Sequence, residues 1–424
     1  MIIRPAKRIE GEVRVPGDKS ISHRAVMLGS IADGTVNISN FAGSADCLAT
    51  IRCMRALGVE IEVDGTSVVV HGVGLHGLKA PSEPLDCGNS GTTTRLLAGI
   101  LAGQPFDSVM TGDESLRSRP MKRIIEPLTQ LGAVIESDDG MAPLRFKGGQ
   151  SLRSIKYTTP VASAQVKSCV LLAGLYADGQ TTVVESTPTR DHTERMLRSF
   201  GVNVTVDCEG RSLSGGSKLR ASDVVVPGDV SSAAFFLIAA ACLADSKLVL
   251  PNVGINPTRS AVLTALENAG ARMIIQEAAG NAEPTAAITI RGGLGHDPLV
   301  LEGSIIANLI DEIPILAVLG TQLEHGLEVR NAKELRVKES DRINSIVTNL
   351  ERMGANVTEF DDGFAVTRSK LKGAKVDSFG DHRIAMAFAV AALLADGESE
   401  ILDAECADVS FPGFYDALER VAVR

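Results

Sequence analysis

Side chains that can bind anions or move protons occur in eight short segments spread along the chain. Several of these segments place a lysine or arginine close to a carboxylate or hydroxyl. Arginine forks match carboxylate and phosphate oxygens, and a carboxylate among cations can carry protons with a pKa set by its neighbours. The pattern therefore predicts a site for substrates with several negative charges. The segments are GDKSISHR (17–24), GNSGTTTR (88–95), SLRSRPMKR (115–123), SAQVK (163–167), TRDHTER (189–195), LIDEIP (309–314), ELRVKESDR (334–342) and GDHR (380–383).

A sixfold internal repeat brings most of these segments to equivalent places. Each copy has an apolar helix, a short turn of small residues and a strand. Chance would scatter reactive groups, whereas this repeat collects them at the start of each apolar helix. The turns end at Gly34, Gly103, Gly179, Ser246, Gly326 and Gly397, and counting back fourteen residues gives Ser20, Asn89, Gln165, Ser232, Glu312 and Arg383.

The six repeated helices are apolar nearly all round, which is typical of buried helices. Their N-termini carry partial positive charge and free N–H groups, so several of them pointing inward together would favour bound anions. A second helix in each of five copies ends at a glycine followed by β-rich sequence. The unit is thus strand–helix–strand–helix–strand–strand, about 70 residues long. These glycines are Gly58, Gly132, Gly201, Gly270 and Gly354, and PGFYDALERV (412–421) is a candidate for the sixth second helix.

The repeat and the chain length predict an α/β fold of two domains with three units each. PGDKS (16–20) and PGDVSS (227–232) are near-duplicates that precede apolar helices, so they mark equivalent points of the two domains. We expect one domain over 19–227 and a second domain made of 1–18 plus 228–424.

Bulk properties exclude several classes of function. The net charge is −10 and no lysine–arginine run occurs, which argues against a nucleic-acid surface. No helix has the uninterrupted apolar length of a membrane span. The seven cysteines lack metal-ligand spacing, so we expect no metal site and reduced thiols. Structured sequence begins at once, with no targeting segment, and a cytoplasmic protein is expected.

Some of the polar residues have simpler interpretations. Ser231 and Ser232 are most simply N-caps of their helix, and Asp381 is about equally suited to capping or chemistry. A lone GNSGT is weak, because glycine-rich turns are common. The placement of the whole set at equivalent helix starts is what favours a site.

Together and in this order, the eight segments resemble the 5-enolpyruvylshikimate-3-phosphate (EPSP) synthase family from about residue 5 to 415. The TRDHTE and KESDR forms resemble a more divergent class of these enzymes. The resemblance implies a two-domain, inverse α/β barrel-like architecture of six βαβαββ units, with buried helices at each domain centre and substrates in the cleft between the domains. It implies transfer of the enolpyruvyl group of phosphoenolpyruvate to the 5-hydroxyl of shikimate 3-phosphate in aromatic amino acid biosynthesis. The resemblance implies that no cofactor is needed and that glyphosate inhibits the enzyme. We expect no partner besides the two substrates, and a monomer.

Roles for individual residues follow from the resemblance alone. The implied proton carriers are Lys19 and Glu339, with Asp311 or Glu339 deprotonating the hydroxyl. The shikimate 3-phosphate set is Lys19, Ser20, Arg24, Ser163, Ala164, Gln165, Arg190, Asp311 and Lys338, and the phosphoenolpyruvate set is Lys19, Gly91, Arg119, Gln165, Arg342 and Arg383.

One departure from the family and two alternatives stay open. Many members carry a phosphate-binding lysine two residues before the C-terminal Phe-Pro, where this chain has Val409. UDP-N-acetylglucosamine enolpyruvyl transferases share the fold, but they typically have Lys-Asn in place of Lys19-Ser20. They also carry a reactive cysteine shortly before the Arg119 position, and TGDESLRSRP (111–120) has none. A non-catalytic anion-binding repeat protein would need the cations but not Asp311 and Glu339 together.

Overall fold

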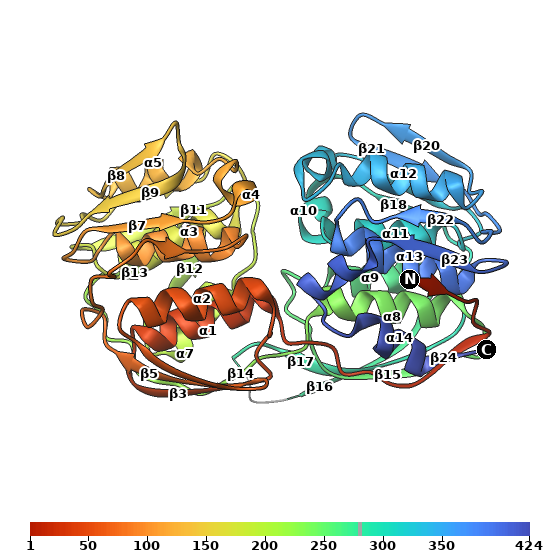
Figure 1. Cartoon of the computed structure of the whole chain (residues 1–424), viewed down its shortest axis with the longest axis horizontal. Helices are drawn as coiled ribbons and strands as arrows, with labels where there is room; N and C mark the ends of the chain where they lie inside the picture. The colour runs from red at the N-terminus through yellow and green to blue at the C-terminus, as the bar shows by residue number, and fades with distance from the viewer. Residues whose placement is uncertain (279–281) are drawn as a thin grey trace. The chain divides into compact units, whose positions relative to one another are not determined.

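The computed structural model describes residues 1–278 and 282–424. The chain divides into two compact units (Figure 1), one formed by Gly17–Val226 and the other by Met1–Pro16 together with Pro227–Arg424. The boundaries expected from the duplicated Pro-Gly segments lie within two residues of these. Each unit contains three repeats, each built on its own small sheet, and the predicted α/β fold of six repeats is confirmed.

The unit Gly17–Val226, red-orange to green in Figure 1, has three four-stranded sheets with one topology. In each sheet the first strand pairs in parallel with the second, and the last two strands are antiparallel. The opening strand of the first repeat, β14 (Val224–Val225), comes from the far end of the unit. The remaining elements are α1 (Lys19–Ser30), β3 (Asp33–Ser39), α2 (Ala45–Ala56), β4 (Glu60–Asp64) and β5 (Ser67–Val73); β6 (Leu85–Asp86), α3 (Gly91–Leu101), β7 (Ser108–Thr111), α4 (Glu114–Arg117), α5 (Lys122–Gln130), β8 (Val134–Asp138) and β9 (Met141–Lys147); and β10 (Lys156–Thr158), α6 (Ala164–Gly174), β11 (Gln180–Val184), α7 (His192–Ser199), β12 (Thr205–Asp207) and β13 (Gly210–Ser214).

The second unit repeats this plan, with the N-terminal segment, red in Figure 1, completing two of the sheets of the part drawn green to blue. Strand β2 (Arg8–Glu12) is the parallel opening strand beside β15 (Lys247–Gly254), and β1 (Ile2–Ile3) pairs antiparallel with β23 (Ser399–Leu402). The other elements are α8 (Val230–Cys242), α9 (Ala261–Asn268), β16 (Arg272–Ala278) and β17 (Thr285–Arg291); β18 (Leu299–Leu301), η1 (Gly303–Ile305), α10 (Ile306–Leu309), α11 (Ile313–Gly320), β19 (Leu327–Val329), η2 (Lys333–Val337), α12 (Arg342–Arg352), β20 (Val357–Phe360) and β21 (Gly363–Val366); and β22 (Lys375–Asp377), α13 (His382–Leu394), η3 (Ala404–Val409), α14 (Phe414–Val421) and β24 (Ala422–Val423).

The sixth second helix is present as α14, as the C-terminal sequence predicts. Its repeat lacks a hairpin of its own, because β24 pairs with β2 and the N-terminal β1 supplies the antiparallel strand. Both chain ends are thus held in sheets of the same unit.

The apolar helices form the centre of each unit. In one unit α3 packs against α1 and α6, and in the other α8, α11 and α13 pack against one another. Every residue from Val230 to Ala241 of α8 is buried, as an all-round apolar helix requires. Gly99 on α3 allows a close approach, because a Cβ there would lie 2.3 Å from the carbonyl oxygen of Cys169 on α6.

The second helix in each of five repeats ends at its glycine, as the sequence predicts. The five glycines have φ between +75° and +105°, which is the left-handed region that favours glycine at a helix C-terminus. Among the described residues no single helix has the length and apolarity to cross a membrane. The pair Gly303–Leu309 and Ile313–Gly320 reaches that length and composition only as two pieces bent by 110°.

Candidate active site

The repeat position identified in the sequence lies at the helix starts. Lys19, Gly91 and Ala164 are the first residues of α1, α3 and α6. In the other unit, Asp311 and Glu312 immediately precede α11, and His382 and Arg383 begin α13. The helices of each unit therefore present the predicted side chains at their N-terminal ends.

Lys19 is held by a carboxylate on the neighbouring helix. Its Nζ donates to Asp46 Oδ2 on α2 at 2.8 Å, and Asp18 caps α1 by accepting from the backbone N–H of Ile21. Burial acts to raise the pKa of Asp46, but the ammonium of Lys19, assisted by Arg119, holds it below the ordinary value. Asp46 thus fixes Lys19 and keeps its own negative charge beside it.

A cluster of arginines surrounds the start of α3. A Cβ on Gly91 would lie 3.1 Å from one terminal nitrogen of Arg95 and 3.5 Å from one of Arg119. Burial, and then the charges of Arg123 and Arg119, lower the pKa of Arg95 to about 10. Arg95, Arg119 and Arg123 form no ion pair with any described residue. Uncompensated guanidinium groups at a helix N-terminus are suited to an anionic ligand.

Arg119 and Gln165 are oriented by neighbours from the second repeat. Arg119 donates to the Asn89 side-chain oxygen at 2.6 Å and to the Ser115 hydroxyl at 3.2 Å. Gln165 on α6 accepts from Arg95 at 2.7 Å and donates to the Thr92 hydroxyl at 3.0 Å. The sequence-predicted Gly91, Arg119 and Gln165 therefore lie in one connected group.

In the unit Gly17–Val226, the residues expected to meet shikimate 3-phosphate lie around α1, α6 and α7. Ser163 is the N-cap of α6 and accepts from the backbone N–H of Val166 at 3.4 Å, and Ala164 follows it. Arg190 immediately precedes Asp191, the N-cap residue of α7. The carbonyl oxygen of Ser20 accepts from Arg24 at 2.7 Å.

Arg24 is more deeply placed than a ligand contact alone would require. Its side chain is buried, and it donates to Thr193 Oγ1 on α7 at 2.7 Å and to Ser168 Oγ on α6 at 2.9 Å. Arg24 therefore joins α1 to α6 and α7 in addition to any contact that it makes with substrate.

In the other unit, Asp311 lies among three arginines. Its carboxylate oxygens are 3.5 Å from Arg342, 3.8 Å from Arg383 and 3.9 Å from Arg259. Arg383 also donates to the backbone carbonyl of Asp311 at 3.0 Å. A carboxylate held among guanidinium groups at a helix start can accept a proton from a bound hydroxyl.

Arg342 is buried within a carboxylate cluster. Its guanidinium donates to Asp381 at 2.7 Å and to Glu339 at 2.6 Å. Burial acts to lower the pKa of Arg342, but Asp381, Glu339 and Asp311 outweigh this and raise it. Arg342 in turn holds the pKa of Glu339 and of Asp381 below their usual values, although burial acts to raise both. Asp381 also caps α13, so it serves both of the roles considered from the sequence.

Glu312, Ser231 and Arg259 form a second buried group beside Asp311. The Ser231 hydroxyl donates to Glu312 and accepts from Arg259 at 2.7 Å. Burial raises the pKa of Glu312, with Asp311 acting in the same direction and Arg259 opposing. The interpretation of Ser231 and Ser232 as N-caps is wrong, because Asp229 caps α8 by accepting from the backbone N–H of Ser231.

Lys338 lies directly after η2, and its ammonium donates to Glu334 at 3.1 Å. Val409 ends η3 and is exposed, so its apolar side chain supplies no cation at the place where many family members have lysine.

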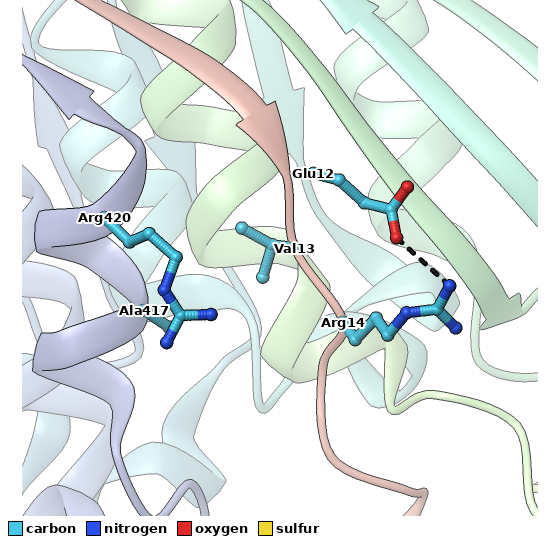
Figure 2. A pocket seen from close by; sticks show the side chains of 5 residues that line it. All are labelled: Glu12, Val13, Arg14, Ala417 and Arg420. Carbon is cyan, nitrogen blue, oxygen red and sulfur yellow. Dashed lines mark ion pairs between the residues drawn. The ribbon is translucent and has the colours of Figure 1, made fainter.

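Two other features of the described residues lie apart from the predicted site residues. Figure 2 shows a surface pocket of about 220 Å³ lined by Glu12, Val13, Arg14, Ala417 and Arg420, in which Arg14 pairs with Glu12 at 3.1 Å. Glu60, Glu62 and His71 on β4 and β5 have possible metal-ligand atoms within 4.8 Å of one another. They lie on a strand surface, where such groups are common without a metal, and we assign no function to them.

Several residues of the two groups were missed from the sequence. Asn89 and Asp381 were named at helix starts but were given no substrate role, and Asp46 and Arg259 were not among the predicted site residues. Arg95 was noted only as the end of its motif, and its signal is the spacing of four residues from Gly91, one turn along the same helix. The partner of Lys19 is 27 residues away and that of Arg342 is 39 residues away, so no local pattern reveals these pairs.

Comparison with known proteins tests the family resemblance of the whole chain. A sequence profile described as EPSP synthase (3-phosphoshikimate 1-carboxyvinyltransferase) matches residues 3–418. The chain is 52% identical over 426 residues to a 3-phosphoshikimate 1-carboxyvinyltransferase of Solibacter usitatus, and 50% identical over 424 residues to one of Brevibacillus brevis, with 99% of each chain covered. An EPSP synthase structure from Acinetobacter baumannii superposes with a TM-score of 0.93 at 44% identity, covering 100% of this chain and 98% of that one. The chain therefore belongs to the EPSP synthase family.

Proposed function

We propose that this chain transfers the enolpyruvyl group of phosphoenolpyruvate to the 5-hydroxyl of shikimate 3-phosphate and releases phosphate, the reaction that its family membership supports. The observation that carries the proposal is the placement of cations and carboxylates at equivalent helix starts of both units. Arg95, Arg119 and Arg123, which form no ion pair with a described residue, suit a multiply charged substrate, and Asp311 suits a hydroxyl. An anion-binding protein without chemistry would not need that carboxylate held among three guanidinium groups.

The phosphoenolpyruvate group of residues is Lys19, Gly91, Arg119 and Gln165 in one unit, with Arg342 and Arg383 in the other. The guanidinium groups near Gly91 offer hydrogen-bond donors without paired acids. Shikimate 3-phosphate would share Lys19 with phosphoenolpyruvate and would meet Ser20, Arg24, Ser163, Ala164, Gln165 and Arg190, with Asp311 and Lys338 at its hydroxyls. Cations fixed before substrate arrives stabilise developing negative charge without reorganising.

The reaction then proceeds by addition and elimination. Asp311 or Glu339 takes the proton of the 5-hydroxyl as its oxygen bonds to C2 of phosphoenolpyruvate, and Lys19 or Glu339 delivers a proton to C3. The bond between C2 and the phosphate oxygen of the tetrahedral intermediate then breaks, and phosphate leaves with that oxygen. The group that protonated C3, Lys19 or Glu339, takes a proton back from the new methyl group. The double bond is thereby restored, and all three carbons of the enolpyruvyl group pass to the acceptor.

Both units are needed for this chemistry, because the residues that it uses are divided between them. We infer that substrates bring the units together, and that closure excludes water from the intermediate. A monomer in the cytoplasm stays a prediction, and size-exclusion chromatography with light scattering checks the monomer.

The choice of acceptor tests the proposed function. We expect phosphate release from phosphoenolpyruvate with shikimate 3-phosphate and none above background with UDP-N-acetylglucosamine. Release with the nucleotide sugar alone would instead assign the chain to the other branch of enolpyruvyl transferases. Tight binding of phosphoenolpyruvate with no release in either mixture would favour an anion-binding protein.

A further inference from the structure

Helix α1 carries two adjacent buried polar residues whose hydrogen bonds run to different helices. His23 contacts α2, whereas Arg24 contacts α6 and α7. Neither interaction reaches the surface, and both lie within two turns of Lys19, which begins the helix. The helix that presents Lys19 is therefore held by two separate polar networks.

The first network links α1, α2 and α3. His23 Nδ1 lies 2.6 Å from Thr50 Oγ1, and Thr50 Oγ1 lies 2.7 Å from Thr93 Oγ1. Thr93 Oγ1 donates to Ser90 Oγ at 2.7 Å, and Ser90 caps α3 directly before Gly91. All four side chains are fully buried. Thr50 lies one helical turn from Asp46 on α2, as His23 does from Lys19 on α1, so the network lies one turn below the Lys19–Asp46 pair.

Hydrogen-bond balance gives this network one direction. Each hydroxyl has a single proton, and Thr93 uses its proton toward Ser90 Oγ at 2.7 Å or the Asp46 carbonyl at 3.4 Å. Thr50 therefore donates to Thr93 and must accept from His23 Nδ1–H. His23 Nε2 has no hydrogen-bond partner among the described residues, which suits an unprotonated nitrogen. Burial, and then the charge of Lys19, lower the pKa of His23 to about 3, with Arg24 acting in the same direction and Asp46 and Asp18 opposing. A neutral His23 therefore anchors the network.

The second network links α1 to α6 and α7. Arg24 donates to Thr193 Oγ1 and Ser168 Oγ, and these two hydroxyls lie 2.7 Å apart. All three side chains are buried. Thr193 lies three residues after Arg190, and Ser168 lies three residues after Gln165, so this network supports the helix starts assigned to shikimate 3-phosphate.

We propose that the two networks position α1 separately for the two substrates: His23–Thr50–Thr93–Ser90 for phosphoenolpyruvate and Arg24–Ser168–Thr193 for shikimate 3-phosphate. The proposal rests on the proposed function. His23, Thr50 and Thr93 are positioning residues, because they set the place of Lys19 relative to Gly91 and have no direct role at the reacting atoms. Small errors in the placement of catalytic groups cost large factors in rate.

Two isosteric substitutions separate the networks. Thr50→Val removes the central hydroxyl of the first network, and Thr193→Val removes one acceptor of Arg24 in the second. Thr50→Ser and Thr193→Ser keep each hydroxyl and should restore function. The matched control is Thr181→Val on β11, because Thr181 is fully buried in the same unit and its hydroxyl has no hydrogen-bond partner among the described residues.

The readout is the pair of Michaelis constants for each variant, with the melting temperature alongside. Thr50→Val should lower kcat/KM for phosphoenolpyruvate about tenfold and leave KM for shikimate 3-phosphate within about twofold. Thr193→Val should instead weaken the use of shikimate 3-phosphate and leave KM for phosphoenolpyruvate nearly unchanged. Thr50→Ser and Thr193→Ser should both have constants close to those of the wild type. His23→Asn breaks the first network at its other end. It should also lower kcat/KM for phosphoenolpyruvate while leaving KM for shikimate 3-phosphate nearly unchanged, and it therefore tests the network even if Thr50→Val folds poorly.

Each contrary outcome has a separate meaning. An active wild type whose Thr50→Val and His23→Asn variants match Thr181→Val overturns the assignment of the first network. If both valine variants lose kcat/KM equally for the two substrates and also melt at a lower temperature, the networks only stabilise the fold. That result also overturns the proposed assignment. A wild type that releases no phosphate from the two substrates overturns the proposed function and, with it, this assignment.

Discussion

At the residue scale, the proposed role of Asp311 as general base is the assignment that mutation tests most directly. Its carboxylate faces three guanidinium groups, so it is placed to accept a hydroxyl proton and return it. We expect Asp311→Asn to lower kcat by about 100- to 10,000-fold, which is the usual contribution of a general base. Phosphate release measures this, and circular dichroism checks the fold. The control is Asp297→Asn, an exposed aspartate of the same unit, and near-full activity of the Asp311 variant would contradict the assignment.

Gly91 makes a second residue-level prediction. A methyl group there would enter the space beside Arg95 and Arg119, at 3.1 and 3.5 Å from their nitrogens. We expect Gly91→Ala to raise the inhibition constant for glyphosate more than the KM for phosphoenolpyruvate, because glyphosate is the longer molecule. Gly43→Ala is the matched control, since a Cβ there would meet nothing within 4 Å. Equal losses for both ligands would show that Gly91 is required by the fold instead.

His23 predicts how stability depends on pH. Its folded pKa of about 3 lies below the unfolded value of 6.5, so the unfolded chain binds the extra proton. Its contribution is therefore fully present above pH 6.5 and is lost as the pH falls toward 3. Between pH 7 and pH 5 this amounts to about 2 kcal/mol in the free energy of unfolding.

Urea unfolding at a series of pH values measures the slope, and His23→Asn should remove this part of it. The exposed His325→Asn serves as the control. A wild-type slope identical to that of His23→Asn between pH 5 and pH 7 would show that His23 ionises normally in the folded protein.

At the element scale, the sequence predicted the repeats well and their side-chain partners poorly. All-round apolar helices and terminal glycines are local signals, and α1, α3, α6, α8, α11 and α13 form where those signals occur. The capping role of Asp229 was missed because two serines follow it closely. Asp46, which holds Lys19, and Asp381, which holds Arg342 together with the local Glu339, belong to other helices. The pairing of these two aspartates depends on how the helices pack. Sequence spacing carries no record of that packing.

The third repeat contains a fully buried ion cluster that the sequence analysis did not predict. Lys167 on α6 pairs with Glu185 after β11 at 3.0 Å and with Glu194 on α7 at 2.8 Å, with all three side chains at most 1% exposed. Lys167→Met would leave the buried carboxylate of Glu194 without its cation and Glu185 with only Arg211, whose Nε lies 3.5 Å away. We expect a loss of about 3–5 kcal/mol in the free energy of unfolding, as for other broken buried pairs.

Denaturant titration measures this loss, and Lys156→Met, which breaks the surface pair with Glu209, should change stability little. The double variant Lys167→Met with Glu194→Gln should recover part of the loss by removing one unpaired charge. If Lys167→Met were as stable as wild type, the cluster would not contribute to holding α6 and α7 together.

At the scale of the whole molecule, the division of one set of residues between two units predicts a change of shape. Shikimate 3-phosphate is assigned contacts in both units, with Arg190 in one and Asp311 and Lys338 in the other. Shikimate 3-phosphate should draw the units together. Small-angle scattering is expected to give a smaller radius of gyration with the ligand than without it. An unchanged profile at saturating ligand would contradict closure.

The central claim is that the carbon–oxygen bond of phosphoenolpyruvate breaks while its enolpyruvyl group passes to shikimate 3-phosphate. Phosphoenolpyruvate with an isotopic label in its bridging oxygen tests this directly, with phosphorus NMR and mass spectrometry of the products. We predict that the label appears in inorganic phosphate, with one enol ether formed for each phosphate and no release when shikimate 3-phosphate is omitted. Label retained in the carbon product, or phosphate formed without shikimate 3-phosphate, would contradict the claim.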